Sequence, residues 1–389
     1  MPHRRVLIAL PCLLLGGTEM HTLALTKALI SGGYQVTVCV YFEYDPLMVE
    51  LMERTGAAIR LLELSRGSGR LEIRMFSRLT RALASVVRQI HPFFLHVQYM
   101  APGVAPILVG RLLGVPRVLA TIHVPASHYG PRASWPRFLA NRVCDAFICV
   151  SQAVEASFFG NSAVFAPAAL RRGRKHFTIW NSVDIEEVDH IRALTDEIAL
   201  RQSLGVNGCK LITMLSRLSP EKGPQYLLDA MPQVMQRAPS AKLLMIGDGP
   251  QKTLLQQQAR QLGIERHVIW AGKMPRQRAF AHLAISDVVV IPSQWEGFGL
   301  AAIEAMAFGK PVVASDIDGL REVVAHGQSG ILVPVGDTAQ LGAAICGLLQ
   351  DETARHGLGR TAREHAVERY SFRAFAGNYL GLYSALSTT

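Results

Sequence analysis

Short apolar runs rich in β-branched residues alternate with longer segments whose apolar positions recur every three or four residues. The short runs predict strands, and the longer segments predict amphipathic helices. The predicted strands are Val6–Leu10, Gln35–Tyr41, Phe93–Val97, Arg117–His123, Ala146–Ser151 and Phe177–Trp180 in a first series, and Leu211–Leu215, Lys242–Ile246, Val268–Ala271, Asp287–Ile291, Pro311–Ala314 and Gly330–Val333 in a second. Strands that alternate with helices form parallel sheets, so the two series predict two doubly wound domains.

The fold class that follows is α/β, with two Rossmann-like domains that face each other across a cleft. We place the first domain at residues 1–185 and the second at 186–370, and we expect a C-terminal helix of about 371–389 to pack back on the first. In such sheets, ligand-binding groups lie beyond the carboxyl ends of the strands. The loops that follow the predicted strands are therefore where we look for chemistry.

The N-terminal segment allows two interpretations. His3-Arg4-Arg5 and the apolar stretch that follows are compatible with a secretory leader. We favour a buried strand at Val6–Leu10, because a strand-to-helix loop follows at Gly16–Glu19 and no small-residue cleavage site precedes it. No apolar run is long enough to cross a bilayer. We therefore expect a cytoplasmic protein.

The cysteines are scattered, which predicts neither a disulfide framework nor a metal cluster. We expect buried free thiols in a reducing compartment. The six cysteines are Cys12, Cys39, Cys144, Cys149, Cys209 and Cys346.

The formal net charge of +10 lies entirely in the first half of the chain. Residues 1–185 carry 20 Lys and Arg against 10 Asp and Glu, whereas residues 186–389 carry 20 of each. Four arginines, Arg74, Arg78, Arg81 and Arg88, fall in one sector of a predicted helix, opposite Phe76, Leu79, Leu83, Val86 and Ile90. This pattern fits a solvated helix face or docking to an anionic membrane or acceptor. Nucleic acid is not expected, because no aromatic platform accompanies the arginines.

Two loops of the second half carry cationic or glycine-rich motifs. The loop Ser216–Gly223 follows the first strand of that half and contains Arg217 and Lys222. A guanidinium fork and a compact ammonium suit a diphosphate, although a surface capping loop is the alternative. Gly247-Asp248-Gly249-Pro250 follows the next strand without completing a nicotinamide fingerprint.

The segment Glu296–Glu304 is the strongest motif in the chain. Its glycines let backbone amides at a helix start face phosphate oxygens, and its two glutamates can accept hydrogen bonds from sugar and ribose hydroxyls. We expect Glu304, like Lys222, at a solvent-lined edge rather than in a core. Gly16 and Gly17 form a similar but weaker strand-to-helix loop in the first half.

In their order and spacing these motifs, with Asn181–Asp184 and Gly319–Val324, resemble the retaining GT-B glycosyltransferases, the family of sucrose synthases and phosphatidylinositol mannosyltransferases. The resemblance implies that Arg217 and Lys222 hold the donor diphosphate and that Glu304 takes the ribose hydroxyls. It also implies donor contacts from the sites Gly16, Gly17, Gly247, Glu296, Phe298, Gly299 and Leu300. Glu296 would position the transferred sugar, and His123 would lie beside it.

The implied reaction moves a hexosyl unit from a nucleotide-diphosphate sugar to an acceptor hydroxyl, with retention and with no metal ion or cofactor. A UDP-sugar is the first expectation and GDP-mannose the second. The expected acceptor is a saccharide or lipid-linked molecule of bacterial cell-surface polysaccharide or glycolipid synthesis. A nucleotide-sugar epimerase and a non-catalytic nucleotide-sugar-binding protein remain alternatives. Asp316-Ile317-Asp318 mimics a metal-binding motif, but we expect a loop with no metal role.

Overall fold

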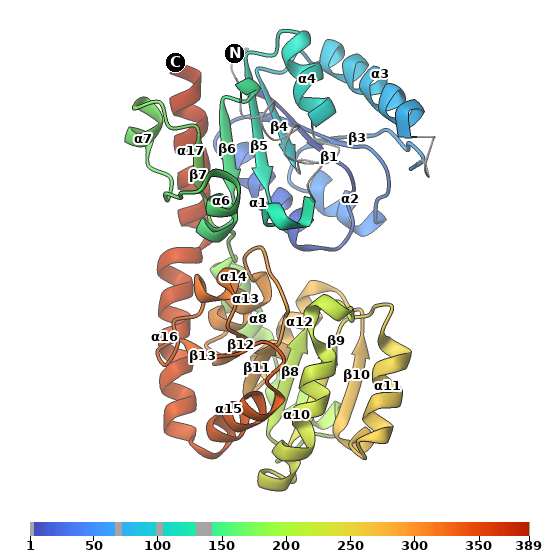
Figure 1. Ribbon diagram of the computed structural model, residues 1–389, viewed down its shortest axis with the longest axis vertical. Coiled ribbons are helices and arrows are strands. Elements are labelled where there is room, and N and C mark those ends of the chain that lie inside the picture. The colour runs from blue at the N-terminus through green and yellow to red at the C-terminus, as the bar shows by residue number, and fades with distance from the viewer. Residues whose placement is uncertain (1–3, 67–71, 99–103, 130–141, 389) are drawn as a thin grey trace. The chain divides into compact units, whose positions relative to one another are not determined.

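The chain forms two compact α/β units, each built around one parallel sheet (Figure 1). The computed structural model describes residues 4–66, 72–98, 104–129 and 142–388. The first unit comprises Met1–Asn181 with Arg373–Thr389, and the second comprises Ser182–Phe372. The boundary between the units therefore follows Asn181, whereas the sequence predicted a boundary after residue 185.

The sheet of the first unit has seven strands in the order β3-β2-β1-β4-β5-β6-β7. Their bounds are β1 Arg5–Leu10, β2 Gln35–Val40, β3 Ala58–Leu61, β4 Phe94–Gln98, β5 Arg117–Ile122, β6 Ala146–Cys149 and β7 His176–Thr178. Strand β3 was not predicted. It lies at the edge of the sheet, and its side chains alternate between exposed and half-buried positions, so it lacks the apolar run that marks the central strands.

The sheet of the second unit has six strands in the order β10-β9-β8-β11-β12-β13. Their bounds are β8 Leu211–Leu215, β9 Lys242–Ile246, β10 Val268–Gly272, β11 Val288–Ile291, β12 Val312–Ser315 and β13 Gly330–Val333. Each of these strands was predicted to within one or two residues. The central strands read as continuous apolar runs because helices cover both faces of a parallel sheet.

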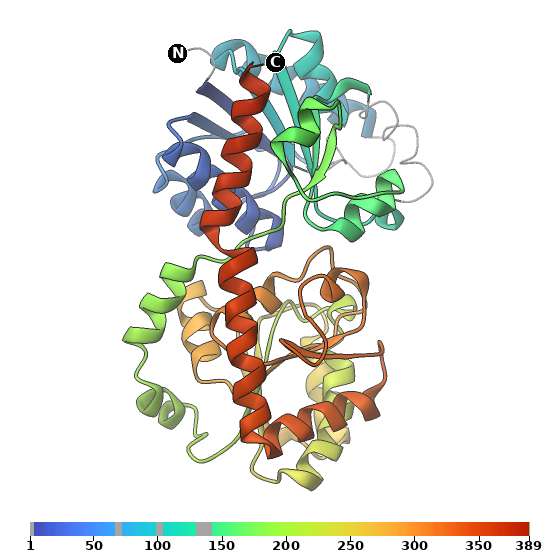
Figure 2. The same cartoon turned by 90° about the vertical axis from the view of Figure 1, so that its left-hand side faces the viewer.

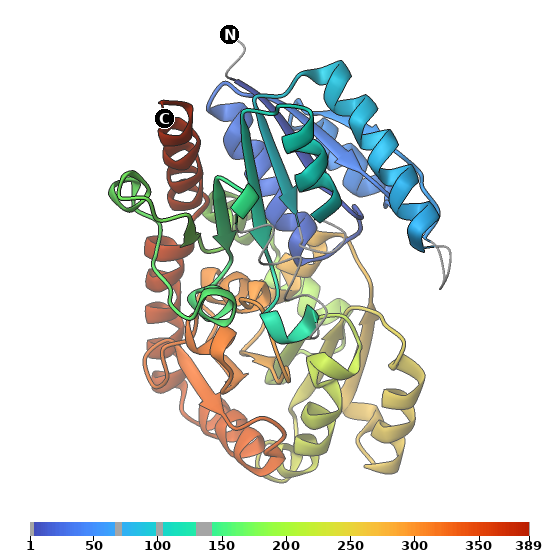
Figure 3. The ribbon, with the colours of Figure 1, turned by 45° about the horizontal axis from the view of Figure 1, so that its top comes forward.

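Helices connect the strands in both units. In the first unit they are α1 Gly17–Ser31, α2 Pro46–Glu53, α3 Glu72–Ile90, α4 Val104–Leu112, the 3-10 turn η3 Ala126–Tyr129, α6 Gln152–Phe159, α7 Pro167–Arg171 and α17 Phe372–Thr388. In the second they are α8 Ile185–Leu194, α9 Glu197–Ser203, η5 Pro220–Lys222, α10 Pro224–Arg237, α11 Lys252–Gln261, η6 Glu265–His267, α12 Arg276–Ala284, α13 Leu300–Ala307, α14 Asp318–Arg321, α15 Thr338–Gln350 and α16 Glu352–Tyr370. Helices α3 and α4 lie side by side on the first sheet (Figure 3).

The C-terminal helix α17 belongs to the first unit and lies along its sheet (Figure 2). Its buried tyrosines bond to buried histidines. Tyr379 Oη lies 3.1 Å from His21 Nε2 on α1, and Tyr383 Oη lies 2.8 Å from His96 Nδ1 on β4. The last residues of the chain therefore complete the core that the first residues begin.

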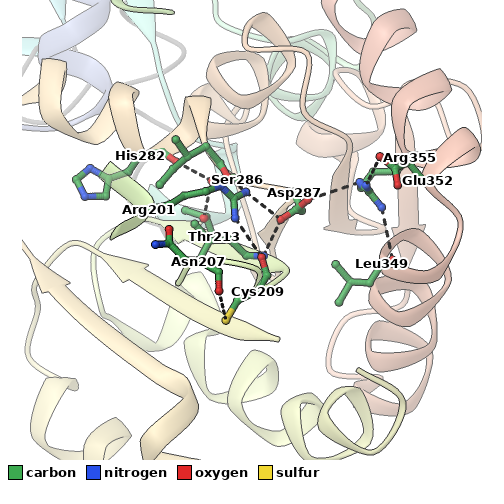
Figure 4. Close-up of polar contacts among 12 residues, drawn as sticks. Arg201, Asn207, Cys209, Thr213, His282, Ser286, Asp287, Leu349, Glu352 and Arg355 are labelled. Atoms are coloured by element: carbon green, nitrogen blue, oxygen red, sulfur yellow. Dashed lines mark hydrogen bonds and ion pairs between the residues drawn. The ribbon is translucent and has the colours of Figure 1, made fainter. Parts of the chain in front are cut away.

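A polar hub around Asp287 ties together the amino ends of β8 and β11 (Figure 4). Asp287 Oδ2 accepts a hydrogen bond from the backbone N–H of Leu211 at 2.8 Å and lies 3.3 Å from Arg201 Nη2. Asp287 Oδ1 lies 3.8 Å from Nε of Arg355, which is buried in α16. Both carboxylate oxygens thus hold elements that are distant in the sequence.

All six cysteines are free thiols, but they are not all buried. Cys39, Cys144, Cys149 and Cys346 are buried as predicted. The expectation is wrong for Cys12 and Cys209, which lie in partly exposed loops beside β1 and β8.

Candidate functional site

The second sheet changes direction between β8 and β11. From β8 the chain proceeds outward through β9 to β10, and it then returns to β11 on the opposite side of β8. The loops that follow β8 and β11 therefore diverge at the carboxyl edge of the sheet, the position where doubly wound folds bind their ligands. The loop after β8 contains Arg217 and Lys222, and the loop after β11 contains Glu296.

Lys222 and Glu296 meet at this point. Lys222 Nζ lies 2.7 Å from Glu296 Oε1, which also accepts a hydrogen bond from Ser293 Oγ at 2.9 Å. The two side chains of the ion pair are 23% and 15% exposed, so both remain within reach of a ligand. Within the described residues, the polar contacts of the Glu296 side chain involve Oε1. Oε2 can therefore accept a hydrogen bond from a bound hydroxyl group.

Glycine allows the loops to approach each other closely. Gly223 has φ +67°, and a Cβ there would lie 1.9 Å from the carbonyl oxygen of Pro292. The backbone N–H of Gln294 donates to the carbonyl oxygen of Glu221 at 2.8 Å. These contacts fix the backbone on either side of the Lys222–Glu296 pair.

Gly247 likewise allows the loops that follow β8 and β9 to approach each other closely. Its φ of +133° disfavours other residues, and a Cβ there would lie 1.9 Å from the carbonyl oxygen of Ser216. The backbone N–H of Leu218 donates to the carbonyl oxygen of Asp248 at 3.0 Å. The predicted Gly247–Pro250 motif thus supports the cationic loop through its backbone.

Arg217 shares the loop of Lys222 but turns to a different carboxylate. Its Nη2 lies 2.5 Å from Glu221 Oε1, which also accepts a hydrogen bond from Ser219 Oγ at 2.7 Å. Burial tends to raise the pKa of Glu221, but the bonds from Ser219 and Arg217 lower it below its usual value. The Arg217 side chain is 67% exposed, so it can turn toward an anion at low cost.

The start of α13 brings backbone amides to the same loop. Gly299 precedes the helix with φ +109°, and Leu300 is its first residue. The amides of Phe298, Gly299 and Leu300 thus lie at a helix N-terminus, where the helix dipole favours an anion. The Phe298 ring is buried against Tyr370, with the ring centroids 5.5 Å apart. Only the backbone of Phe298 can therefore serve a ligand.

Glu304 does not lie at the solvent-lined edge where it was expected. Its side chain on α13 is buried, and its Oε1 lies 2.5 Å from Arg276 Nη1. Arg276 also lies 3.4 Å from Glu187 Oε2 and above the ring of Phe280. The expectation failed because the partner, Arg276, is distant in the sequence and covers Glu304. A ribose contact by Glu304 would share its carboxylate with Arg276.

Gly319 is a site residue whose purpose the sequence motif did not disclose. A Cβ there would lie 2.4 Å from the carbonyl oxygen of Glu296, so only glycine lets the segment after β12 pack beneath the Glu296 loop. Beside it, Arg321 binds both Asp316 and Asp318. The two aspartates of the metal-like motif thus hold an arginine. No cluster of three potential metal-ligating side chains occurs within the described residues.

Gly16 and Gly17 begin α1 in the first unit, as the motif predicted. The amides at this helix start already face a carboxyl group. Glu19 folds back onto them and accepts hydrogen bonds from the backbone N–H groups of Leu14 and of Glu19 itself. Burial raises the pKa of Glu19 above its usual value. A phosphate at this helix start would have to displace this side chain.

His123 follows β5 in the first unit and is buried. Its Nε2 lies 2.8 Å from Oε1 of Gln98, the last residue of the adjacent strand β4. The ring of His21 lies at 4.9 Å, edge to face. Burial, together with His21 and His96, holds the pKa of His123 well below its usual value, so the imidazole is neutral at physiological pH. Gln98 and His21 were not singled out from the sequence, because neither stands in a motif.

Helix α3 presents its arginines to solvent. Arg78, Arg81 and Arg88 are exposed, while Leu79, Leu83 and Val86 are buried against the sheet as the helical pattern predicted. The side chain of Arg74 lies outside the described residues. Phe76, predicted on the apolar face, is instead 45% exposed. Among the described helices, none has the length and apolar character needed to cross a membrane.

Comparison with known proteins agrees with this division into units. Residues 15–161 match the family described as Glycosyltransferase Family 4, and residues 196–365 match the Glycosyl transferases group 1 family. The chain thus contains a group 1 glycosyltransferase domain at residues 196–365. The second match contains Arg217, Lys222, Glu296 and Glu304, and the first contains His123.

The relatives of this chain include proteins named as phosphatidylinositol mannosyltransferases. A phosphatidyl-myo-inositol mannosyltransferase of Mycobacterium leprae is 28% identical over 96% of this chain and 94% of its own length. A GDP-mannose-dependent phosphatidylinositol monomannoside mannosyltransferase of Mycolicibacterium smegmatis is 32% identical over 45% of this chain and 47% of its own length. Several other relatives match over 46 to 53% of their length, so the chain spans about half of those proteins.

The solved structures establish the fold. Anabaena HepE, determined in complex with UDP-glucose, superposes with a TM-score of 0.81 at 22% sequence identity, over 98% of this chain and 99% of its own. The chain thus has the GT-B fold of two Rossmann-like domains that the sequence predicted.

Proposed function

We propose that the chain is a retaining hexosyltransferase that moves a sugar from a nucleotide diphosphate to an acceptor hydroxyl. The observation that carries the proposal is the Lys222–Glu296 pair at the switch point of the second sheet. It joins a cation for the diphosphate to a carboxylate for the sugar, and the amino end of α13 follows on the same loop. Ligands of doubly wound sheets bind at this position.

Charge development at the leaving group gives each residue its role. When the glycosidic bond to the diphosphate breaks, negative charge grows on the phosphate oxygens. The amides at the start of α13 and Lys222 stabilise this charge from loops whose backbone is fixed, and Arg217 joins them once its exposed side chain turns from Glu221. Glu296 accepts hydrogen bonds from the sugar, and Glu304 accepts from the ribose while it remains bonded to Arg276.

The donor that we propose first is a UDP-sugar, and the second is GDP-mannose. A protein of this fold, Anabaena HepE, has been solved with UDP-glucose, and a relative that matches over part of its length is named as GDP-mannose-dependent. For the acceptor we propose a saccharide or lipid-linked molecule of bacterial cell-surface synthesis, because the relative matched over nearly its whole length is named as a phosphatidylinositol mannosyltransferase.

A titration tests the donor site. Isothermal calorimetry with UDP, GDP and ADP should show binding of one nucleoside diphosphate, and Lys222→Met should weaken it. Lys242→Met is the matched control, since Lys242 lies at the opposite, amino end of β9 and bonds the carbonyl oxygen of Arg266. Equal binding by wild type and Lys222→Met would remove Lys222 from the proposed site.

Turnover separates the proposed reaction from its alternatives. With a matched acceptor we expect free nucleotide and a product whose anomeric configuration, measured by NMR, equals that of the donor. Epimerised donor without acceptor would indicate an epimerase, and binding without turnover would indicate a sensor.

We also propose that no metal ion is needed, because Lys222 and Arg217 supply positive charge. Activity should therefore persist in EDTA, and a loss that manganese restores would contradict this.

We further propose that the protein acts in the cytoplasm and attaches peripherally to an anionic membrane through α3. Arg78, Arg81 and Arg88 are exposed on one helix, and each basic residue near an acidic leaflet contributes about 1 kcal/mol. Such binding should weaken with salt, because the Debye length is about 10 Å at 0.1 M. Co-sedimentation with anionic vesicles should fall when these three arginines and Arg74 are changed to glutamine. Equal binding to neutral vesicles would leave the helix face merely solvated.

A further inference from the structure

Arg276 and Glu304 form a largely buried ion pair within the second unit. Arg276 Nη1 lies 2.5 Å from Glu304 Oε1, and the two side chains are 23% and 10% exposed. The Nε atom of Arg276 lies 3.4 Å from Glu187 Oε2 on α8, and its guanidinium carbon lies 4.0 Å from the ring centroid of Phe280. Two carboxylates and an aromatic ring therefore fix the guanidinium in place.

The pair lies at the carboxyl edge of the sheet. Helix α13 begins in the loop that follows β11, and Glu304 is in its second turn. A helical side chain points toward the N-terminus of its own helix, so the carboxylate of Glu304 points back toward that edge. Arg276 reaches the same edge because it is the first residue of α12, which follows β10. Lys222 and Glu296 lie at this edge of the same unit.

The contacts of Glu304 leave one of its oxygens available to a ligand. Within the described residues, the polar contacts of its side chain involve Oε1. Both oxygens of a carboxylate accept hydrogen bonds, so Oε2 can accept one from a bound hydroxyl group. The formal charges of Arg276, Glu187 and Glu304 sum to one negative charge, which repels a phosphate group. The cluster therefore suits the hydroxyl groups of a ligand rather than its diphosphate.

Arg276 keeps its positive charge in these surroundings. Burial tends to lower its pKa, but the nearby carboxylates of Glu304 and Glu187 raise the pKa above its usual value. A buried carboxylate without a cationic partner costs free energy. Arg276 thus compensates the charge of Glu304 while it holds Oε1.

We propose that Arg276 is a positioning residue that holds Glu304 for the ribose hydroxyls of the donor, so that the site prefers a ribonucleotide to a nucleotide without these hydroxyls. This inference rests on the proposed function, which assigns the ribose to Glu304. Arg276 acts through Glu304 and does not itself contact the nucleotide.

A comparison of two nucleotides measures this role. Isothermal calorimetry uses UDP and 2′,3′-dideoxy-UDP, or the corresponding GDP pair where GDP is the nucleotide that binds. The wild type should prefer the ribonucleotide about 10- to 100-fold, as expected for hydrogen bonds to a charged group. Arg276→Met should lower the preference at least about tenfold or abolish it, by weakening the ribonucleotide and leaving the Kd of the dideoxy form within about twofold. A wild-type preference in Arg276→Met would overturn the proposal.

Two further variants control for charge and folding. Arg278→Met removes an exposed arginine from the same helix, so it should leave the preference unchanged. Arg276→Lys keeps the positive charge but lacks the guanidinium fork that spans Glu304 and Glu187, so its preference should lie between those of wild type and Arg276→Met. If thermal unfolding shows that Arg276→Met does not fold, Arg276→Lys decides, and a wild-type preference there overturns the proposal.

The pattern of losses separates positioning from other roles. If Arg276→Met weakens both nucleotides by the same factor, Arg276 contacts another part of the nucleotide or supports the loop, and the positioning role fails. If the wild type binds neither nucleotide, the proposed function itself fails. If the wild type prefers the ribonucleotide and Arg276→Met keeps that preference, the proposed function stands and only this inference fails.

Discussion

Lowering the pH from 7.5 to 5.5 should destabilise the first unit through His21, His96 and His123. These side chains are buried without a carboxylate partner among their described hydrogen bonds. Burial lowers the pKa of His21 to about 4 and of His96 to about 3, and it lowers that of His123 well below the usual value. In the unfolded chain each histidine titrates near pH 6.5, about its ordinary value.

The sign and size of the effect follow from proton binding. At pH 5.5 the unfolded state takes up protons that the folded state refuses, so stability is full above about pH 6.5 and falls as the pH drops below it. One pH unit below the unfolded pKa costs about 1.4 kcal/mol per histidine, or about 4 kcal/mol for the three together. Glu19 opposes this loss in part, because its raised pKa favours the folded state on acidification.

Hydrogen exchange measured by mass spectrometry can localise the loss. Peptides from β4, β5 and α17 should show a drop of up to about 4 kcal/mol in opening free energy between pH 7.5 and 5.5, after correction for intrinsic exchange. His96→Gln should reduce the difference between the two pH values by about 1.4 kcal/mol. Equal opening free energies at both pH values would refute the reasoning, as would an equal loss in β8 and β9.

Three further predictions concern the second unit. Lys222→Met should raise the Kd of the bound nucleoside diphosphate about 10- to 100-fold by calorimetry, since a hydrogen bond to a charged group is worth about 1.5–3 kcal/mol; an unchanged Kd would contradict it. Gly319→Ala should cost about 1–3 kcal/mol in urea unfolding and weaken donor binding, because its Cβ would press on the Glu296 carbonyl oxygen; wild-type values for both would show that the loop can yield. Asp287→Ala should cost about 3 kcal/mol in thermal unfolding, because it leaves two arginines without their shared carboxylate; a shift below 1 kcal/mol would disprove a stabilising hub.

Strand positions were predictable where burial requires a recognisable run of apolar residues. A strand covered on both faces must be apolar at successive positions, as Leu243 to Ile246 of β9 are, and such runs identified all the central strands. The edge strand β3 has Arg60 and half-exposed neighbours, so its sequence differs little from that of a loop. Pairing with β2, which is a tertiary contact, makes it a strand.

Site residues were predictable when they stood in motifs and unpredictable when they only supported them. Lys222 and Glu296 were both singled out, although their contact spans 74 positions and depends on β8 lying beside β11. Arg276 was missed because an arginine at the start of a polar helix resembles any solvated residue. Its contact with Glu304 arises only when the fold brings α12 beside α13, whereas Phe280 lies one turn further along α12 itself.

The two edges of the second sheet use charge in different ways, and the difference bears on how a donor could enter. At the amino edge both oxygens of Asp287 are committed to groups on other elements, so breaking the contacts would loosen the fold. At the carboxyl edge the described contacts of Glu296 engage Oε1 alone, and Lys222 is its partly exposed partner. A diphosphate can replace Glu296 as the partner of Lys222 while a sugar hydroxyl replaces Lys222 as the partner of Glu296. Neither charge is then left buried and unpaired, which is the condition that makes broken ion pairs expensive. In the proposed function, the donor would exchange with an internal contact, and the backbone contacts at Gly223 and Gln294 would hold the loops in place when it is lost.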